Sequence, residues 1–329
     1  MVKNIVTFIV PDSFFGERAD IIISKSFPQF SRSRIKKWIE DGHILIDGNK
    51  INPKKKLFPG ESIVVNPQDD DREVEFQPED IDFQVIYVDD DIAVINKPAG
   101  LVVHPADGNW SGTLLNGILY KFPNNKFLPR AGIVHRLDKD TSGLLVIGLN
   151  ESSQKQLIEQ LQKKTVHREY RAIVWGNIYS NVKIDEPIGR HPTNRVKMAI
   201  NNINGKHAVT HITPLENFKY HSYIKCLLET GRTHQIRVHM NHNKTPIIGD
   251  PVYGFKKIIP MLNGQKPLTE SILGFNRQAL HAKKIGITHP RTKKQMNWET
   301  SLPEDIESLL NILRQYTSFE LDQLNKDFD

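Results

Sequence analysis

Residues 135–143 read HRLDKDTSG and form the densest group of chemically active side chains in the chain. The segment holds two carboxylates, an arginine, a lysine and two hydroxyls, and the apolar residues 144–147 follow at once. A polar loop that leads into a buried strand places its side chains at the end of a rigid sheet, where they can face a cleft. The sequence therefore predicts a functional site here.

The two carboxylates of this segment, Asp138 and Asp140, are only two residues apart. If both are ionised in a cleft of low dielectric constant, a positive charge must lie nearby. Arg136 and Lys139 are local candidates, and a residue distant in sequence is another. Asp140 can instead shape the turn. We therefore assign Asp138 to chemistry and Asp140 to turn structure.

A second cluster, TGRTHQIRVH, occupies residues 230–239. Thr233 is predicted to cap a helix, which leaves Arg232 at the N-terminal entrance, from where it can reach into a cleft. His234 and His239 are five residues apart, whereas helical zinc sites pair histidines four apart. No metal site is predicted, and both histidines are interpreted as structural.

A third cluster, HREYRAIVWG, begins at residue 167 and places Tyr170 between Arg168 and Arg171. A buried tyrosine is most often part of a core with its hydroxyl hydrogen-bonded. A tyrosine flanked by arginines is also suited to stacking on a nucleic-acid base. The residues alone leave both interpretations open.

The composition is typical of a globular protein that does not span a membrane. The chain has 329 residues, 38% hydrophobic and 25% charged, and no apolar run of about 18 residues. No signal peptide is recognisable, so a cytoplasmic location is expected. The single cysteine, Cys226, excludes an intramolecular disulfide and a multi-cysteine metal site.

The charge is unevenly distributed along the chain. Residues 67–82 carry eight acidic side chains and one arginine, and this stretch is predicted to be a linker between two domains. Because the whole chain carries +6, the remainder carries +13. An excess of this size favours a polyanionic partner.

The segment before the linker is predicted to be a small binding module of two helices and short strands, because it has little interior volume for chemistry. Ser31 can cap the second helix, which runs to Asp41. Positive charges on this helix and in one loop favour an anionic ligand. The candidate residues for contacting this ligand, which the resemblance below implies to be RNA, are Arg32, Arg34, Lys36, Lys37, Lys54, Lys55 and Lys56.

Residues 83–316 alternate short β-rich runs with a few helices in irregular order. This order favours an α+β domain with a mixed or antiparallel sheet over a doubly wound fold. Residues 317–329 are polar and are predicted to be a frayed tail.

These segments resemble two known families. SRSRIKKWIEDGHILIDG and PGESIVV, within residues 15–66, resemble the S4 RNA-binding domain. The three clusters above, together with INKPAGLVVHP and RQALHAKKIGITHP, resemble the HRLD-containing pseudouridine synthases that act on ribosomal and transfer RNA. Five motifs in the family's order make a chance match very improbable.

The resemblance implies specific roles for the site residues. The family's aspartate falls on Asp138, and its arginine falls on Arg232, which implies an ion pair that keeps Asp138 ionised. Tyr170 matches the residue that stacks on the target base, and Arg136 matches one that fills the gap left by the flipped nucleotide. Arg168 stands beside the site where many relatives carry lysine. The isomerisation involves no redox change, so no cofactor is expected.

The implied partner is large-subunit ribosomal RNA or a pre-ribosomal particle. Three alternatives remain: a paralogue that modifies other uridines of the same RNA, a non-catalytic RNA-binding assembly factor, and a glycoside hydrolase that uses Asp138 and Asp140. The last is disfavoured, because two carboxylates in one turn are poorly placed to flank a sugar at a separation of roughly 5 Å or more.

Overall fold

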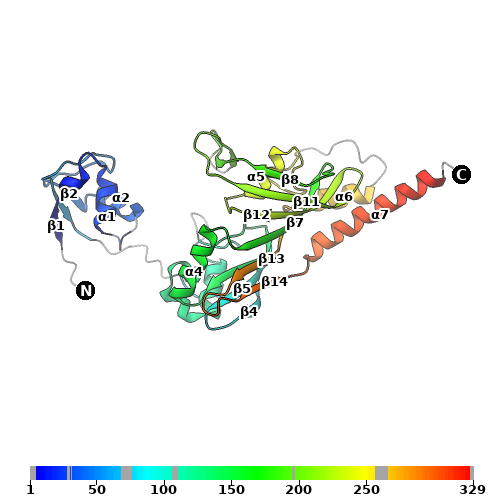
Figure 1. Cartoon of the computed structure of the whole chain (residues 1–329), viewed down its shortest axis with the longest axis horizontal. Coiled ribbons are helices and arrows are strands. Elements are labelled where there is room, and N and C mark those ends of the chain that lie inside the picture. Colours follow the sequence, from blue (N-terminus) through cyan, green and yellow to red (C-terminus); the bar gives the residue numbers. More distant parts are fainter. Residues whose placement is uncertain are drawn as a thin grey trace. The chain divides into compact units, whose positions relative to one another are not determined.

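The computed structural model describes residues 5–27, 30, 32–67, 76–105, 110–194, 197–255 and 266–326. Only the backbone is described for residues 33, 34, 266 and 318–326. The chain divides into two compact units, Met1–Glu75 and Phe76–Asp329 (Figure 1). Part of the predicted linker, residues 68–75, and the predicted helix cap Ser31 lie outside the described residues.

The N-terminal unit packs two helices against a small antiparallel sheet of strand order β1-β3-β2. Apolar side chains at helical spacing, including Ile22, Ile23, Ile35 and Ile39, fill its core. The unit begins before residue 15, where the predicted domain started, because β1 pairs with β3. Its elements are β1 (Val6–Ile9), α1 (Ala19–Ser26), α2 (Arg32–Asp41), β2 (Ile44–Ile46) and β3 (Ser62–Val65).

The C-terminal unit is built on one mixed sheet, which confirms the predicted α+β class. The strand order is β4-β5-β6-β13-β7-β12-β11-β8, with β14 paired to β13, and the β9–β10 hairpin stands apart. The strands are β4 (Gln84–Val88), β5 (Ile92–Lys97), β6 (Ser142–Gly148), β7 (His167–Trp175), β8 (Val182–Asp185), β9 (Ile188–Arg190), β10 (Met198–Ile200), β11 (Val209–Asn217), β12 (His221–Leu228), β13 (Leu280–Thr288) and β14 (Gln295–Glu299).

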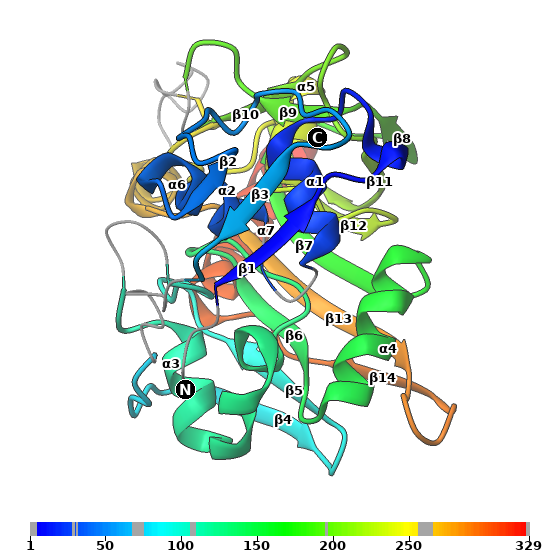
Figure 2. The same cartoon turned by 90° about the vertical axis from the view of Figure 1, so that its left-hand side faces the viewer.

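Within the described residues, five α-helices accompany this sheet, and α4 lies alongside the β13–β14 hairpin (Figure 2). They are α3 (Leu114–Lys121), α4 (Glu151–Gln162), α5 (Gln235–His242), α6 (Lys266–Gly274) and α7 (Glu304–Lys326). The tail predicted from residue 317 is helical as far as it is described, because α7 continues past residue 317 to Lys326 (Figure 1). No helix in the described ranges combines the length and the hydrophobicity needed to cross a bilayer.

The sheet brings the HRLD segment beside a distant part of the chain. β6 follows this segment and pairs with β13 in parallel, whereas the other strand pairs are antiparallel. Gly143 is required at this contact: its φ is +114°, and a Cβ atom there would lie 2.3 Å from the carbonyl oxygen of Ala282. The close approach anchors the HRLD loop at the centre of the sheet.

The described part of the predicted linker, residues 76–82, is attached to the C-terminal unit. The side-chain amide of Asn116 donates to the carbonyl of Gln77, and the Glu79 amide donates to the Asn116 carbonyl. The Glu79 carboxylate accepts a hydrogen bond from the Gly112 amide. This part of the linker prediction was wrong, because sequence composition does not reveal that the segment crosses α3.

Candidate active site

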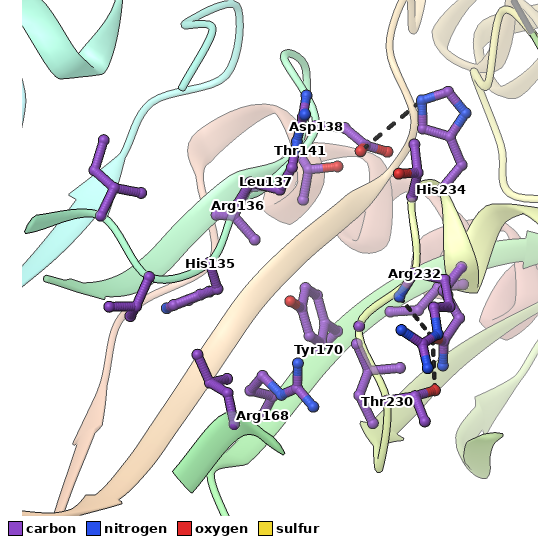
Figure 3. Close-up of a pocket in the computed structure, with 18 of the residues that line it drawn as sticks. His135, Arg136, Leu137, Asp138, Thr141, Arg168, Tyr170, Thr230, Arg232 and His234 are labelled. Atoms are coloured by element: carbon purple, nitrogen blue, oxygen red, sulfur yellow. Dashed lines mark hydrogen bonds and ion pairs between the residues drawn. The ribbon is translucent and has the colours of Figure 1, made fainter. Parts of the chain in front are cut away.

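A cavity of about 820 Å³ in the C-terminal unit is lined by all three motif clusters. The HRLD loop supplies Arg136 and Asp138, β7 supplies Arg168 and Tyr170, and the segment from the end of β12 into α5 supplies residues 228–237 (Figure 3). Although these clusters are far apart in sequence, their strands are close together in one sheet. The fold therefore assembles the predicted site.

Asp138 is held through one carboxylate oxygen. Its backbone carbonyl accepts from the Thr141 amide at 3.1 Å and closes the turn. Oδ2 accepts a hydrogen bond from Nη1 of Arg237 at 2.9 Å, while Oδ1 lies 3.9 Å from Nε2 of His234, beyond hydrogen-bond distance. The Asp138 side chain is 18% exposed and lines the cavity. Oδ1 is therefore the carboxylate oxygen without a hydrogen bond among the described contacts.

Arg237 lies on α5 and connects two carboxylates. Its Nε and Nη2 donate to the two oxygens of Asp250 at 2.7 and 2.9 Å, and Asp250 also accepts from the amides of Val252 and Tyr253. Burial alone would lower the pKa of Arg237, but hydrogen bonds to Asp250 and the charges of Asp250 and Asp138 raise it above the usual value. The guanidinium thus stays charged, and its hydrogen bond fixes the orientation of the Asp138 carboxylate.

The prediction of an ion pair at Asp138 was therefore right, but the predicted partner Arg232 was wrong, because the partner is Arg237. Arg232 lines the cavity, but its Nε donates to the carbonyl of His207 at 3.0 Å. The helix also starts later than predicted: α5 begins at Gln235, and His234 precedes it with φ of +57°. Arg232 consequently lies in the loop before the helix.

The side chain of Gln235 explains this late helix start. Its Oε1 accepts from the Arg232 amide and from the hydroxyl of Thr230, and its Nε2 donates to the carbonyl of Val209. These bonds bind the loop to β11, whereas Thr233 makes none of the capping bonds predicted for it among the described contacts.

A sequence signal for Arg237 did exist. It stands between Ile236 and Val238, in a stretch of α5 that is buried throughout. An arginine in such a stretch needs a carboxylate partner. Asp250, in the sequence GDPVYG, was an available candidate.

His234 contacts the site without serving as the main cation for Asp138. Burial lowers its pKa, while the carboxylate of Asp138 opposes that shift. Its Nδ1 is 2.9 Å from the Tyr253 hydroxyl, which also accepts from the Met198 amide. His239, by contrast, is structural as predicted, because its ring nitrogens contact Thr210 and the Glu186 carbonyl.

Tyr170 and Arg168 project from β7 toward the cavity (Figure 3). Tyr170 is 7% exposed, and burial raises its pKa to about 12, so its hydroxyl stays protonated at neutral pH. Arg168 is 8% exposed; its Nη2 donates to the Glu229 carbonyl, but its buried Nε has no partner among the described residues. The cavity therefore contains a buried cation with no carboxylate bound to it.

Lys97 fixes the HRLD loop by hydrogen bonds from its side chain. Its side chain is fully buried, and Nζ donates to the carbonyls of Pro98, Leu101 and Lys139 at 2.8 to 2.9 Å. Burial lowers the pKa of Lys97 to about 7, and the carboxylates of Asp140 and Asp138 oppose that shift. One ammonium group thus ties the loop after β5 to the turn that carries Asp138.

We predict that Lys97→Met lowers the free energy of unfolding by about 3 kcal/mol, since the three hydrogen bonds from one buried ammonium group are lost and, among the described contacts, only the Lys139 carbonyl keeps another donor, the Gly100 amide. Lys139→Met, at an exposed position of the same turn, is the matched control and should change stability by less than about 0.5 kcal/mol. Chemical denaturation of both variants tests this. Equal stabilities would show that the three hydrogen bonds contribute nothing.

One group of metal-ligand type occurs among the described residues, formed by Asp89, Asp91 and His289. Its atoms are already engaged: Asp89 Oδ2 lies 2.8 Å from Nε2 of His289 and accepts from the Tyr87 hydroxyl, and Asp91 pairs with Arg291 at 2.7 Å. The group is therefore an ion-pair and hydrogen-bond network.

The candidate RNA-binding residues of the N-terminal unit differ in their surroundings. On α2, Lys36 lies 3.5 Å from Glu40 and Lys37 lies 4.0 Å from Asp41. Arg32 donates to the buried Asp20 at 2.8 Å, and the side chain of Arg34 lies outside the described residues. Lys54, Lys55 and Lys56 occupy a loop opposite the start of α1.

Comparison with known proteins shows the family to which the chain belongs. The profile described as RNA pseudouridylate synthase matches residues 91–242, and that of the S4 domain matches residues 17–63. "Ribosomal large subunit pseudouridine synthase D" of Neisseria meningitidis is 46% identical over 95% of this chain and 83% of its own length. The chain belongs to the RNA pseudouridylate synthase family. It is an RNA pseudouridine synthase and hence an isomerase.

Other members of the family agree in sequence and in fold. The synthase of the same name from Escherichia coli strain K12 is 43% identical over 94% of both chains. Among solved structures, human RNA pseudouridylate synthase domain containing 4 matches with a TM-score of 0.55 and 25% identity, covering 70% of this chain and 92% of its own. The family resemblance predicted from the five motifs is thus confirmed.

Proposed function

We propose that this pseudouridine synthase isomerises uridines of large-subunit ribosomal RNA, either as free RNA or within a pre-ribosomal particle. The observation that carries the proposal is similarity over nearly the whole chain, through both units, to synthases named for the large ribosomal subunit. An S4 domain joined to the synthase unit is consistent with a large structured RNA. A cytoplasmic location would follow from such a substrate.

The charges in the cavity support a polyanionic substrate. Arg130 and Arg136 line the cavity together with Arg168, and no carboxylate is hydrogen-bonded or ion-paired to any of the three within the described ranges. Both Arg130 and Arg136 are exposed at the surface of the cavity. Cations without counter-charges are suited to contacting RNA phosphates.

The proposed chemistry breaks the bond between the uracil nitrogen and the anomeric carbon, turns the base, and joins a ring carbon to the sugar. We assign the reacting carboxylate to Asp138, acting through Oδ1, whether it attacks the sugar or removes a sugar proton. Tyr170 and Arg136 both line the cavity, and we assign Tyr170 to contact the detached base and Arg136 to occupy the gap left by the flipped nucleotide. Arg237, in place of the predicted Arg232, is the ion-pair partner that orients Asp138.

The test is a map of pseudouridines after incubation of the full chain with large-subunit ribosomal RNA, large-subunit particles, small-subunit ribosomal RNA and transfer RNA. We expect new pseudouridines in the large-subunit RNA or its particles. Modification confined to small-subunit or transfer RNA would contradict the proposed target. The positions in the map also separate this assignment from a paralogue that modifies other uridines of the same RNA.

The non-catalytic alternative is disfavoured by the intact ion-pair network. Asp138, Arg237 and Asp250 form a continuous chain of charged hydrogen bonds that ends at a free carboxylate oxygen in the cavity. A pure binding module would have no need of an ionised carboxylate inside an RNA-binding cavity, where it repels phosphate.

A further inference from the structure

Two tight turns in the N-terminal unit present phenylalanine rings at the surface. Phe15 has φ of −53° and ψ of 117°, and Gly16 follows with φ of +70°, so the pair forms the centre of a type II turn. The Glu17 amide donates to the Phe14 carbonyl and closes this turn. A side chain at the second position of such a turn points away from the chain.

Phe58 opens the other turn, which continues through Pro59 and Gly60. The Glu61 amide donates to the Phe58 carbonyl, and Gly60 has φ of +91°. The Phe58 amide in turn donates to the carboxylate of Glu61 at 2.6 Å. The two turns are therefore ordered by backbone hydrogen bonds and by a glycine in each.

Backbone hydrogen bonds also hold the two turns side by side. The Gly16 amide donates to the Leu57 carbonyl and the Leu57 amide donates to the Glu17 carbonyl, both at 2.9 Å. The Phe15 and Phe58 rings consequently meet edge to face, with centroids 5.3 Å apart. Phe15 is 72% exposed and Phe58 47%, while Leu57 between them is buried. The pair is a fixed aromatic surface rather than part of a core.

Three consecutive lysines adjoin this aromatic pair. The Lys55 carbonyl accepts from the Ala19 amide, and Lys55 Nζ donates to Glu61, the same carboxylate that binds the Phe58 amide. Lys54 and Lys56 are exposed and have no acidic partner among the described residues. The candidate cations of α2 whose side chains are described each have a carboxylate nearby, so the uncompensated charge lies beside the rings.

We propose that Phe15 and Phe58 form a stacking platform for an unpaired RNA base, with Lys54 and Lys56 contacting the phosphates on either side. The inference rests on the proposed function in that RNA is the ligand. Aromatic faces next to cations suit single-stranded nucleotides, because every base offers a face to stack and every phosphate a charge to bind. Two rings are too small an apolar area for a stable protein interface, which buries roughly 800 Å² per partner.

The experiment compares the full chain with the variant Phe15→Leu/Phe58→Leu, which keeps apolar side chains and removes both rings. The probes are a 12-nucleotide single-stranded oligoadenylate carrying one 2-aminopurine and a 12-base-pair RNA duplex. We expect the double variant to bind the single strand about 10- to 100-fold more weakly and to lose the quenching of 2-aminopurine that stacking causes. Binding to the duplex should stay within about 2-fold, because its bases are already stacked.

Two further variants separate stacking from apolar docking. Phe15→Trp should bind the single strand at least as tightly as the unmodified chain, and Ile5→Ala, at a site 61% exposed in the same unit, should bind unchanged. The proposal is overturned if the Leu/Leu variant binds the single strand normally, or if it loses single strand and duplex equally. It is also overturned if this variant binds both RNAs normally but loses large-subunit particles, which would indicate a protein partner.

Different experimental results would contradict the stacking platform and the proposed function. If the platform is wrong, the unmodified chain still forms pseudouridine in large-subunit RNA while the Leu/Leu variant binds oligoadenylate normally. If the proposed target is wrong, the unmodified chain itself leaves large-subunit RNA without new pseudouridines.

Discussion

Asp138→Asn is expected to reduce the rate of pseudouridine formation by at least about 10³-fold while RNA binding stays within about 2-fold. Asparagine has the same shape and can still accept the hydrogen bond from Arg237, but its amide can neither attack the sugar nor remove a proton. Single-turnover conversion of large-subunit RNA measures the rate, and a filter-binding titration measures the affinity. The predicted loss is therefore chemical rather than structural.

Asp140→Asn is the matched control for this prediction. Asp140 lies in the same turn, and among its described contacts the backbone carbonyl accepts from Arg277 Nη1, which the substitution leaves in place. We expect its activity to remain within about 5-fold of the unmodified chain, because no reacting group is removed. If Asp140→Asn were inactive and Asp138→Asn active, the assignment of the two carboxylates would have to be reversed.

Arg237→Gln is expected to lower the free energy of unfolding by about 3 to 5 kcal/mol and to abolish measurable activity. The substitution leaves Asp250, whose side chain is fully buried, without a cation, and it removes the donor to Asp138 Oδ2. Neutral glutamine cannot replace a guanidinium that donates to both carboxylates. Chemical denaturation and single-turnover assays measure the two effects.

Arg232→Gln is the control that distinguishes the two arginines of TGRTHQIRVH. Its hydrogen bond goes to a backbone carbonyl at the surface, so stability should change by less than about 0.5 kcal/mol. Arg237→Lys separates folding from catalysis, because it keeps a charge near Asp250 but loses the fork that binds two carboxylates. If Arg232→Gln were the destabilised variant, the ion-pair network described here would be wrong.

Local residue patterns were sufficient to predict most of the fold. Apolar spacing and end signals predicted that the second helix ends at Asp41, as α2 does, because this helix depends on nearby residues and on one buried face. The pattern missed β1, because its exposed residues look like an unstructured start until they pair with β3. It also missed the continuation of α7, where polar residues gave no sign of helix.

The sequence by itself determined the chemistry of this protein. The motif HRLDKDTSG, followed by an apolar run, predicted a reacting carboxylate at Asp138, because residue types and their neighbours along the chain carry that information. The base-stacking role predicted for Tyr170 came from the resemblance of HREYRAIVWG to the family's motif. Only the tertiary structure decided which cation serves Asp138. Arg237 and Asp138 are 99 residues apart, and their contact depends on where Gln235 starts α5 and on the burial of Asp250 beneath it. An ion pair between distant segments depends on the order of the strands in the sheet and on the residue at which the helix begins. The spacing of residues along the sequence specifies neither of these.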